Sequence, residues 1–318
     1  MLYSSSYSLF LFVVKKITAY NKYLGPHMLY HACDSTGLCM KILQEYHVSS
    51  SGKISGLRML VLKDHENMAL SVMDLIEPKN LTRMHLNPRN WKVDHSTLVS
   101  PVYELQAGAG FFMESLSLTA PEIQKVLVLG LGGGSTSSFL VQLPLNVNVD
   151  AVELENSMYN VATEYFDLPV SPKLHVFIQD GIEYMDEAVR KGVIYQSILL
   201  DACANNANLT VMCPAPSFLE GGPVRALSLL VGMKGVLSVN VFTPRYNERT
   251  YQEVLAIFAK HFRSCFYLSG EVGSKTMFCS NKKNWDYEHQ RNRFLKNMEE
   301  FDNFAHTYLA LTVEEHNK

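Results

Sequence analysis

Charged residues are scarce in this 318-residue sequence and nearly cancel, because 28 Lys plus Arg face 31 Asp plus Glu and leave a net charge of −3. A chain without a basic excess lacks the signature of a protein that binds nucleic-acid backbones through charge. Long apolar runs are also missing. The run at residues 9–14 is far shorter than the roughly 20 residues that cross a bilayer, and we interpret it as a buried strand or an incomplete leader. We expect a globular chain that binds neither nucleic acid nor membrane.

Cysteine is infrequent as well, with six residues at positions 33, 39, 203, 213, 265 and 279. No C-x-x-C pair and no Cys and His cluster with zinc-ligand spacing is present, so we expect no metal site. The simpler interpretation is a reducing compartment, and we predict the cytoplasm. Cys203 and Cys213 raise the alternative of a thiol nucleophile, which ranks low because no His lies between them.

The sequence divides into two parts near residue 93. Residues 1–93 contain short apolar runs bounded by turn formers, which predict strands joined by hairpins. From residue 125 onward strand-like and helical patterns alternate, which predicts a mostly parallel sheet with helices on both faces. The last two strand-like runs, CFYLS and SKTMFCSN, lie too close together for a helical crossover and predict an antiparallel hairpin.

The expected fold is therefore α/β. A small β-rich region, 1–93, precedes a Rossmann-like domain, 94–318, whose mostly parallel sheet ends in an antiparallel hairpin, which is the layout of class I methyltransferases. Small residues at 107–110 predict a helix packed closely against its neighbour. The tail repeats apolar residues at spacings of three and four, which predicts an amphipathic helix that includes Phe294, Met298, Phe301, Ala305 and Tyr308.

A glycine-rich turn follows the strand-like run at residues 126–129, in the segment VLVLGLGGGS. Gly130, Gly132 and Gly134 carry no side chain, so a ligand can approach the backbone amides at the start of the next helix, which we expect Ser135 to cap. A tight structural turn is the plainer alternative. The glycine density favours a site for a nucleotide-like cofactor.

Acidic side chains end the next two strand-like runs. Glu153 lies 23 positions after Gly130, the distance at which a carboxylate accepts hydrogen bonds from ribose hydroxyls. Asp180, followed by Gly181, ends the third run and can accept a hydrogen bond from an adenine amino group. Together these residues predict an adenosine-containing ligand at one edge of the sheet. Glycine spacing does not separate NAD from S-adenosylmethionine, but Ser135 at the third glycine position and the terminal hairpin favour S-adenosylmethionine.

The runs VLVLGLGGGS, DAVELENSM, QDGIEYM and LLDACANN together resemble the spermidine synthase-like branch of class I methyltransferases, over residues 94–281. The runs DHSTLVSPVYELQAG and CPAPSF are similar to the C-terminal domain of the methyltransferase-like 13 family, which methylates elongation factor 1-alpha. The resemblance implies that the three glycines line the methionine end of the donor, that Glu153 holds ribose and Asp180 adenine, and that Asp201 lies beside the acceptor amine.

Two departures from these patterns bear on the chemistry. Spermidine synthases carry an aspartate in the glycine loop where this chain has Gly133, and an aspartate there would repel the carboxylate of intact S-adenosylmethionine. Both patterns carry a second acid after the position of Asp201, and this chain lacks it. Compared with the methyltransferase-like 13 pattern, this chain has Asn205 or Asn206 at that place. The first departure favours the methyl donor, and the second weakens a diamine pocket and raises the alternative of a pseudoenzyme.

We therefore predict a protein N-methyltransferase that uses S-adenosylmethionine, with elongation factor 1-alpha implied as substrate by resemblance and an N-terminal amine or a lysine as acceptor. Asp201 would orient the amine and stabilise its developing positive charge, and Asn240 would offer a side-chain carbonyl. For Asn240 a sheet-edge amide is an equally good interpretation. A polyamine aminopropyltransferase and a catalytically impaired binding module are the alternatives, and a homodimer stays open.

Overall fold

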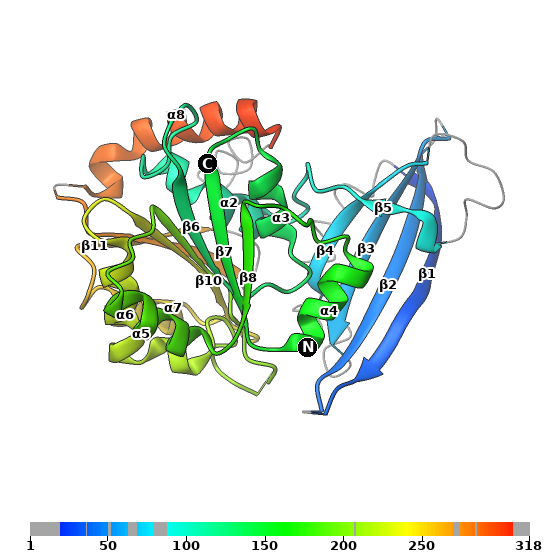
Figure 1. Cartoon of the computed structure of the whole chain (residues 1–318), viewed down its shortest axis with the longest axis horizontal. Helices are drawn as coiled ribbons and strands as arrows, with labels where there is room; N and C mark the ends of the chain where they lie inside the picture. Colours follow the sequence, from blue (N-terminus) through cyan, green and yellow to red (C-terminus); the bar gives the residue numbers. More distant parts are fainter. Residues whose placement is uncertain are drawn as a thin grey trace.

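The structure is a computed structural model that describes residues 20–35, 37–49, 52–62, 69–78, 88–206, 208–269, 274–283 and 285–307. Two β-sheets stand side by side, a smaller antiparallel one from the N-terminal part and a larger one flanked by helices (Figure 1). The apolar run at residues 9–14 lies outside the described residues. No described helix combines the length and apolarity needed to cross a membrane.

The larger sheet has seven strands in the order β11-β12-β10-β9-β6-β7-β8. Their bounds are β6 Gln124–Leu129, β7 Val147–Glu153, β8 Leu174–Ile178, β9 Ser197–Leu200, β10 Val236–Phe242, β11 Ser264–Ser269 and β12 Ser274–Ser280. Strands β6 to β10 pair in parallel, whereas β12 is antiparallel to both β10 and β11. The predicted parallel sheet with its terminal hairpin is therefore confirmed.

Helices cover both faces of this sheet, as predicted. One face carries α2 Pro101–Phe112, α3 Ser135–Gln142 and α8 Tyr287–Ala305, and the other carries α5 Gly181–Arg190, α6 Gly221–Val231 and α7 Glu248–Phe258. Short 3-10 turns lie at Pro88–Asn90 and Pro216–Leu219. Helix α8 runs along one side of the sheet in Figure 1. Its predicted apolar stripe is buried from Phe294 to Ala305, and Tyr308 lies outside the described residues.

The small residues 107–110 of α2 are buried, and the side chains that fill the space of the Cβ atoms missing at its glycines belong to the same helix and to the segment after it. A Cβ atom at Gly108 would lie 2.0 Å from the Phe112 ring, and one at Gly110 would lie 2.5 Å from Leu116. The rings of Phe111 and Phe301 stack at 4.9 Å between α2 and α8. The aromatic residues at 111 and 112 therefore belong to the core, which their apolar character favours over a role in covering a ligand.

The smaller sheet has five antiparallel strands in sequence order, β1 Tyr20–Cys33, β2 Cys39–Ser49, β3 Ile54–Leu62, β4 Ala69–Ile76 and β5 Lys92–Val93. The strands predicted from the apolar runs before residue 93 are confirmed as β2, β3 and β4. Helix α4, Asn156–Tyr165, follows β7 of the larger sheet but packs Met158 and Val161 into the core of the smaller one. This helix therefore joins the two sheets.

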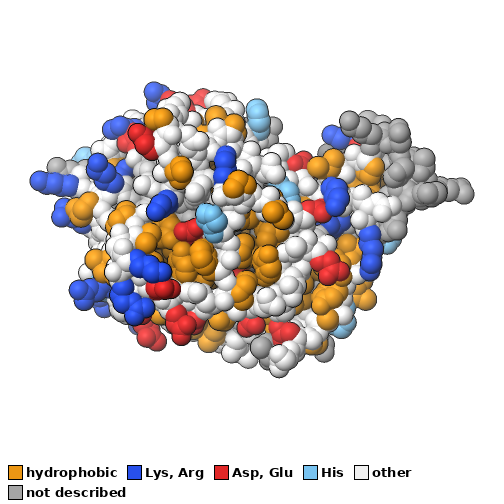
Figure 2. Space-filling view, viewed as in Figure 1, with side chains coloured by type: hydrophobic (Ala, Val, Ile, Leu, Met, Phe, Trp, Pro, Cys, Tyr) orange, Lys and Arg blue, Asp and Glu red, His pale blue; other side chains and the backbone are white. Residues whose placement is uncertain are grey.

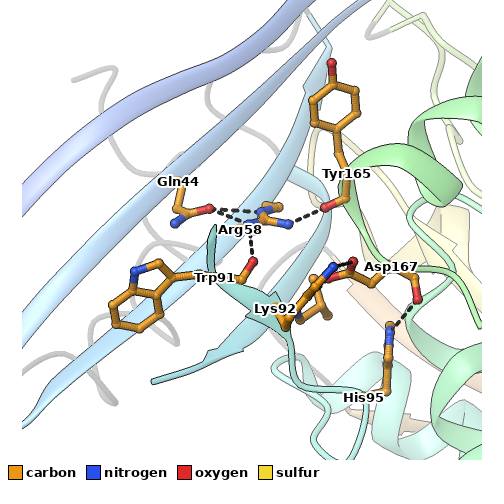
Figure 3. Close-up of polar contacts among 8 residues, drawn as sticks. Gln44, Arg58, Trp91, Lys92, His95, Tyr165 and Asp167 are labelled. Atoms are coloured by element: carbon orange, nitrogen blue, oxygen red, sulfur yellow. Dashed lines mark hydrogen bonds and ion pairs between the residues drawn. The ribbon is translucent and has the colours of Figure 1, made fainter. Parts of the chain in front are cut away.

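A buried arginine adds polar contacts at the same junction (Figure 3). Arg58 on β3 is 4% exposed and donates to Gln44 Oε1 at 2.9 Å, to the carbonyl of Trp91 at 2.8 Å and to the carbonyl of Tyr165 at the end of α4. Because a guanidinium presents five donors in a fixed plane, it can bridge several acceptors at once. Beside it, Lys92 bonds Asp167 at 2.8 Å.

The cysteines contradict the interpretation as free thiols. They form three disulfides, Cys33–Cys39, Cys203–Cys213 and Cys265–Cys279. The first and third join residues that face each other across antiparallel strands. The cysteines are 6 and 14 residues apart in the chain, and only the register of the strands brings them together. Disulfides of this number are typical of oxidising compartments, so cysteine usage no longer supports a reducing one.

Candidate active site

A cavity of about 960 Å³ lies where the carboxyl ends of the central parallel strands meet the smaller sheet. Its lining comes from the glycine loop after β6, from Glu153, Asp180 and Asp201 at the carboxyl ends of β7, β8 and β9, and from β4 residues 69–72. Parallel α/β sheets bind their ligands at this edge, and the volume is within the range of about 300–1,000 Å³ for small-molecule sites. The sequence predicted a ligand at this edge of the sheet, and the cavity lies there, but the sequence did not reveal that β4 contributes to its lining.

The glycine loop has the backbone that its composition predicts. Gly130 has φ +97°, and a Cβ atom there would lie 2.6 Å from the carbonyl oxygen of Asp201. Gly134 has φ +80° and occupies the cap position of α3, so Ser135 is the first helical residue and does not cap the helix as expected. The cap lies one residue earlier than predicted because the cap residue is in the left-handed conformation, which strongly favours glycine. Gly130 and Gly132 line the cavity.

Freed from capping, the α3 serines present unpaired hydroxyls. Ser135 and Ser137 line the cavity, are 7% and 1% exposed, and form no side-chain hydrogen bond with any described residue. Buried hydroxyls without partners cost free energy, so a polar ligand group beside them is favoured. They fit the polar methionine end of an adenosyl donor, and the neighbouring helix N-terminus favours its carboxylate.

Glu153 holds the loop from the end of β7. Its Oε2 accepts from the amides of Leu131 at 3.0 Å and Gly132 at 3.4 Å, and its Oε1 accepts from Glu155 at 3.0 Å. A carboxylate accepts about four hydrogen bonds, so one position on Oε1 remains for a ribose hydroxyl. Glu153 is 9% exposed and faces the cavity, so it can order the loop and contact a ligand.

The smaller sheet touches the glycine loop directly. The amide of Gly133 donates to Ser71 Oγ on β4 at 2.8 Å. A Cβ atom at Gly133 would lie 3.0 Å from the Ser71 Cβ and 3.2 Å from the Phe166 ring. A side chain at position 133 therefore requires Ser71 and Phe166 to shift by a few tenths of an ångström. Nothing in the sequence pointed to Ser71, because its contact depends on how the two sheets pack.

Asp180 and Gly181 stand where the third parallel strand ends. Asp180 Oδ1 accepts from the amide of Ile182 at 2.6 Å and so caps α5, whereas its Oδ2 is available to a ligand. Gly181 begins the helix beside the Phe218 ring, which a Cβ atom would approach to 3.1 Å. Both residues line the cavity. Asp180 can therefore cap α5 through Oδ1 and still bind adenine through Oδ2.

Asp201 and Asn240 come together in the wall of the cavity, next to Gly130. Asn240 Nδ2 donates to Asp201 Oδ1 at 2.7 Å, and no described residue bonds Asp201 Oδ2. Loss of water around the carboxyl group raises the pKa of Asp201 to about 6, and the Asn240 bond opposes this shift. The Asn240 oxygen accepts from Ser274 Oγ at 3.0 Å, because the amide nitrogen faces the carboxylate, and the use of this carbonyl toward an acceptor stays a prediction.

The loop after Asp201 forms the nearby wall and is closed by the Cys203–Cys213 disulfide. The two sulfur atoms and the Asp201 carboxylate lie within 4.8 Å of one another, but a disulfide offers neither a thiolate nucleophile nor a metal ligand. The alternative of a thiol nucleophile at these positions is therefore wrong. Tyr103 also lines the cavity, where its hydroxyl donates to the carbonyl of Leu70 at 2.7 Å.

Comparison with known proteins gives two groups of relatives, and no family model matches the chain. The eEF1A lysine and N-terminal methyltransferase homolog of Drosophila melanogaster is 30% identical over 161 residues, which are 50% of this chain and 24% of that protein. The eEF1A lysine and N-terminal methyltransferase of Homo sapiens is 32% identical over 119 residues, 36% of this chain and 17% of that protein. The chain thus matches about a quarter or less of the length of these relatives.

The polyamine aminopropyltransferase of Vibrio vulnificus (strain CMCP6) is 30% identical over 142 residues, 43% of this chain and 46% of that protein.

Solved structures show the same two groups. Human methyltransferase-like protein 13, crystallised in complex with SAH, superposes with a TM-score of 0.57 at 24% identity and covers 65% of this chain and 92% of that one. A probable spermidine synthase from Corynebacterium glutamicum ATCC 13032 has a TM-score of 0.57 at 11% identity and covers 89% of this chain and 94% of that one. The class I methyltransferase fold with an N-terminal β region, shared with spermidine synthases, is therefore confirmed.

Proposed function

We propose that the chain is an S-adenosylmethionine-dependent protein N-methyltransferase that acts on elongation factor 1-alpha, at its N-terminal amine or a lysine. The observation that carries the proposal is the Asp201–Asn240 pair, which faces the same cavity that the glycine loop lines. The relatives named as eEF1A methyltransferases support the substrate. The cavity therefore offers side chains for a donor and for an acceptor.

The donor would occupy the glycine-loop end of the cavity. S-adenosylmethionine supplies a methyl group on a sulfonium sulfur. Glu153 would accept from a ribose hydroxyl and Asp180 from the adenine amino group, with Gly181 beside it. Gly130 and Gly132, which line the cavity, would let the backbone approach the methionine end, and Gly134, which does not line it, would shape the turn into α3; Ser135 and Ser137 offer hydroxyls there.

At the acceptor end, Asp201 Oδ2 would accept a hydrogen bond from the substrate amine and so aim its lone pair at the methyl group. The ionised carboxylate would also stabilise the positive charge that the nitrogen gains during transfer. An α-amine, with a usual pKa of about 7.7–8.0, is neutral near physiological pH far more often than a lysine at about 10.4. A site with one carboxylate therefore suits transfer to an N-terminal amine better than transfer to a lysine, which needs more help to lose its proton.

Aminopropyl transfer to a polyamine is a second candidate. In its favour, the 89% coverage by a probable spermidine synthase extends beyond residues 94–318 into the β-rich region. Against it, this chain has Gly133 where those enzymes carry an aspartate, and Ser71 and Phe166 would have to shift by a few tenths of an ångström to admit a side chain there. Calorimetry with S-adenosylmethionine and its decarboxylated form separates the two: we expect heat with the first and at least tenfold weaker binding of the second.

A binding module without catalysis is the third candidate, because Asn205 or Asn206 replaces the second acid after Asp201. Incubation with radiolabelled S-adenosylmethionine and either purified elongation factor 1-alpha or cell extract tests all three. We expect one labelled protein band, with the label lost in Asp201→Ala and the donor still bound. Donor binding without label on any protein would support the binding module and contradict the methyltransferase.

Division of the chain into a β-rich region, 1–93, and a methyltransferase domain, 94–318, is also a proposal. So is a homodimer, for which apolar side chains on the β8 edge strand, Phe177 and Ile178 at 36% and 40% exposed, are the candidate contact. Apolar side chains gather near the middle of the face in Figure 2, where β8 lies in Figure 1. Sedimentation at micromolar concentration checks the dimer.

The cytoplasm is proposed from the substrate, the elongation factor of translation. The three disulfides argue against it. Mass spectrometry after rapid thiol labelling in intact cells decides: labelled cysteines support the cytoplasm, and protected pairs contradict it.

A further inference from the structure

Strand β12 supplies a residue that the reaction described above does not yet use. Ser274, the first residue of β12, pairs with Phe242 across the antiparallel ladder, and its hydroxyl reaches Asn240 two positions earlier on the same face. Ser274 and Asn240 both line the cavity. The hydroxyl donates to Asn240 Oδ1 at 3.0 Å, while Asn240 Nδ2 donates to Asp201 Oδ1 at 2.7 Å. A chain of two hydrogen bonds therefore ends on the acceptor carboxylate.

The direction of these bonds follows from charge. Ionised Asp201 only accepts hydrogen bonds, so the amide nitrogen of Asn240 must face it and the amide oxygen must face the other way. Ser274 is the group that donates to that oxygen. Without this donor the amide loses the partner that favours its present orientation over the flipped one, in which two oxygens would face each other.

Strand β12 is held at this point from its opposite face. Lys275 bonds Glu248 Oε2 on α7 at 2.7 Å, and its ammonium lies 4.7 Å from the ring centre of Tyr251 and 5.7 Å from that of Tyr267. A cation enclosed by aromatic rings and a carboxylate is fixed by several interactions at once. We call this arrangement of Lys275 with Glu248, Tyr251 and Tyr267 the Lys275 cage. Because neighbouring residues of a strand point to opposite faces, the Lys275 cage anchors the backbone from which Ser274 projects.

We propose that Ser274, fixed by the Lys275 cage, is a positioning residue that holds Asn240 as a donor to Asp201 and leaves Asp201 Oδ2 free for the acceptor amine. The inference rests on the proposed methyl transfer for its catalytic meaning. Its structural part concerns only the protonation and hydrogen bonding of Asp201. The other ionisable side chains that line the cavity are Tyr103, Glu153, Glu155 and Asp180, and Lys275 and Glu248 lie on the far side of β12.

Thr276 provides a matched control on the same strand. It pairs with Asn240 in the ladder, is fully buried, and its hydroxyl forms no hydrogen bond with any described residue. Thr276→Val is nearly isosteric and removes a hydroxyl that serves no partner. Ser274→Thr keeps the hydroxyl that Ser274→Ala removes.

The experiment measures methyl transfer and the titration of the Asp201 carboxyl carbon by NMR in each variant, with the signal assigned from Asp201→Asn. For Ser274→Ala we expect a fall in kcat of about tenfold, unchanged donor affinity, and an Asp201 midpoint raised by about half a pH unit, because a weakened amide bond favours the ionised form less. Ser274→Thr should keep kcat and the Asp201 midpoint closer to the wild-type values than Ser274→Ala does. Thr276→Val should leave kcat and the midpoint unchanged.

An Asp201 midpoint in Ser274→Ala that equals that of the wild type would overturn the proposal, as would equal losses in Ser274→Ala and Thr276→Val. If the wild type methylates no acceptor while the midpoint shifts as expected, the positioning role stands and the proposed function fails. Lys275→Met should produce a smaller shift in the same direction, since it loosens the anchor without removing the hydroxyl.

Discussion

Replacing Asp201 by asparagine should stabilise the protein while abolishing transfer. Burial raises the pKa of Asp201 from its usual 3.8 to about 6, so the folded chain binds this proton more tightly than the unfolded chain does. Above pH 6 the ionised carboxylate therefore costs the folded state free energy, and below pH 4 the cost disappears. At about 1.4 kcal/mol for each pH unit, and allowing for partial exposure, the cost at pH 8 is about 2–3 kcal/mol.

Asp201→Asn removes this cost, because the amide oxygen can still accept from Asn240 and carries no charge. Urea unfolding followed by circular dichroism should give a free energy of unfolding about 2–3 kcal/mol higher than the wild type at pH 8, and the difference should vanish near pH 4. Asp180→Asn is the control, since asparagine caps a helix as well as aspartate does. A difference at pH 8 that is zero or destabilising, or one that does not change between pH 8 and pH 4, would refute the reasoning.

Three further predictions concern the site and its support. Transfer by the wild type should fall as the pH drops through about 6, because Asp201 then gains a proton and stops accepting from the amine, and a pH profile at saturating donor checks this. Arg58→Met should lower the free energy of unfolding by about 3–5 kcal/mol in urea titrations, because the acceptors at Gln44 and Trp91 lose a buried donor, whereas an effect below 1 kcal/mol would contradict the role of this contact. The double change Cys203→Ser and Cys213→Ser should slow transfer with little effect on donor affinity, because the loop it frees lines the acceptor end; an equal loss of donor affinity in calorimetry would argue otherwise.

Local patterns predicted the parts of the fold that depend on neighbours along the chain. Alternating strand and helix signals gave the parallel sheet, and the short separation of the last two strands gave the antiparallel hairpin. The glycine loop and the residues Glu153, Asp180 and Asp201 line one cavity because parallel strands all end at the same edge. Each of these expectations needed only the chain order and the geometry of a βα unit.

What failed, or could not be seen, depends on contacts between distant residues. Ser135 does not cap α3 because the left-handed turn places Gly134 there. Ser71 meets the glycine loop only because the two sheets pack together, and Ser274 meets Asn240 only through the register of β10 and β12. The disulfides were missed for the same reason, since strand register brings Cys265 opposite Cys279.

The central claim is that the edge of the sheet binds S-adenosylmethionine through Glu153, separately from acceptor chemistry at Asp201. Isothermal titration of S-adenosylmethionine into the wild type, Glu153→Ala and Asp201→Ala tests it most directly. We predict saturable binding to the wild type and to Asp201→Ala, and a loss of at least a hundredfold in Glu153→Ala, whose circular dichroism spectrum should remain that of the folded chain. No heat with the wild type, or equal weakening by the two substitutions, would contradict the account.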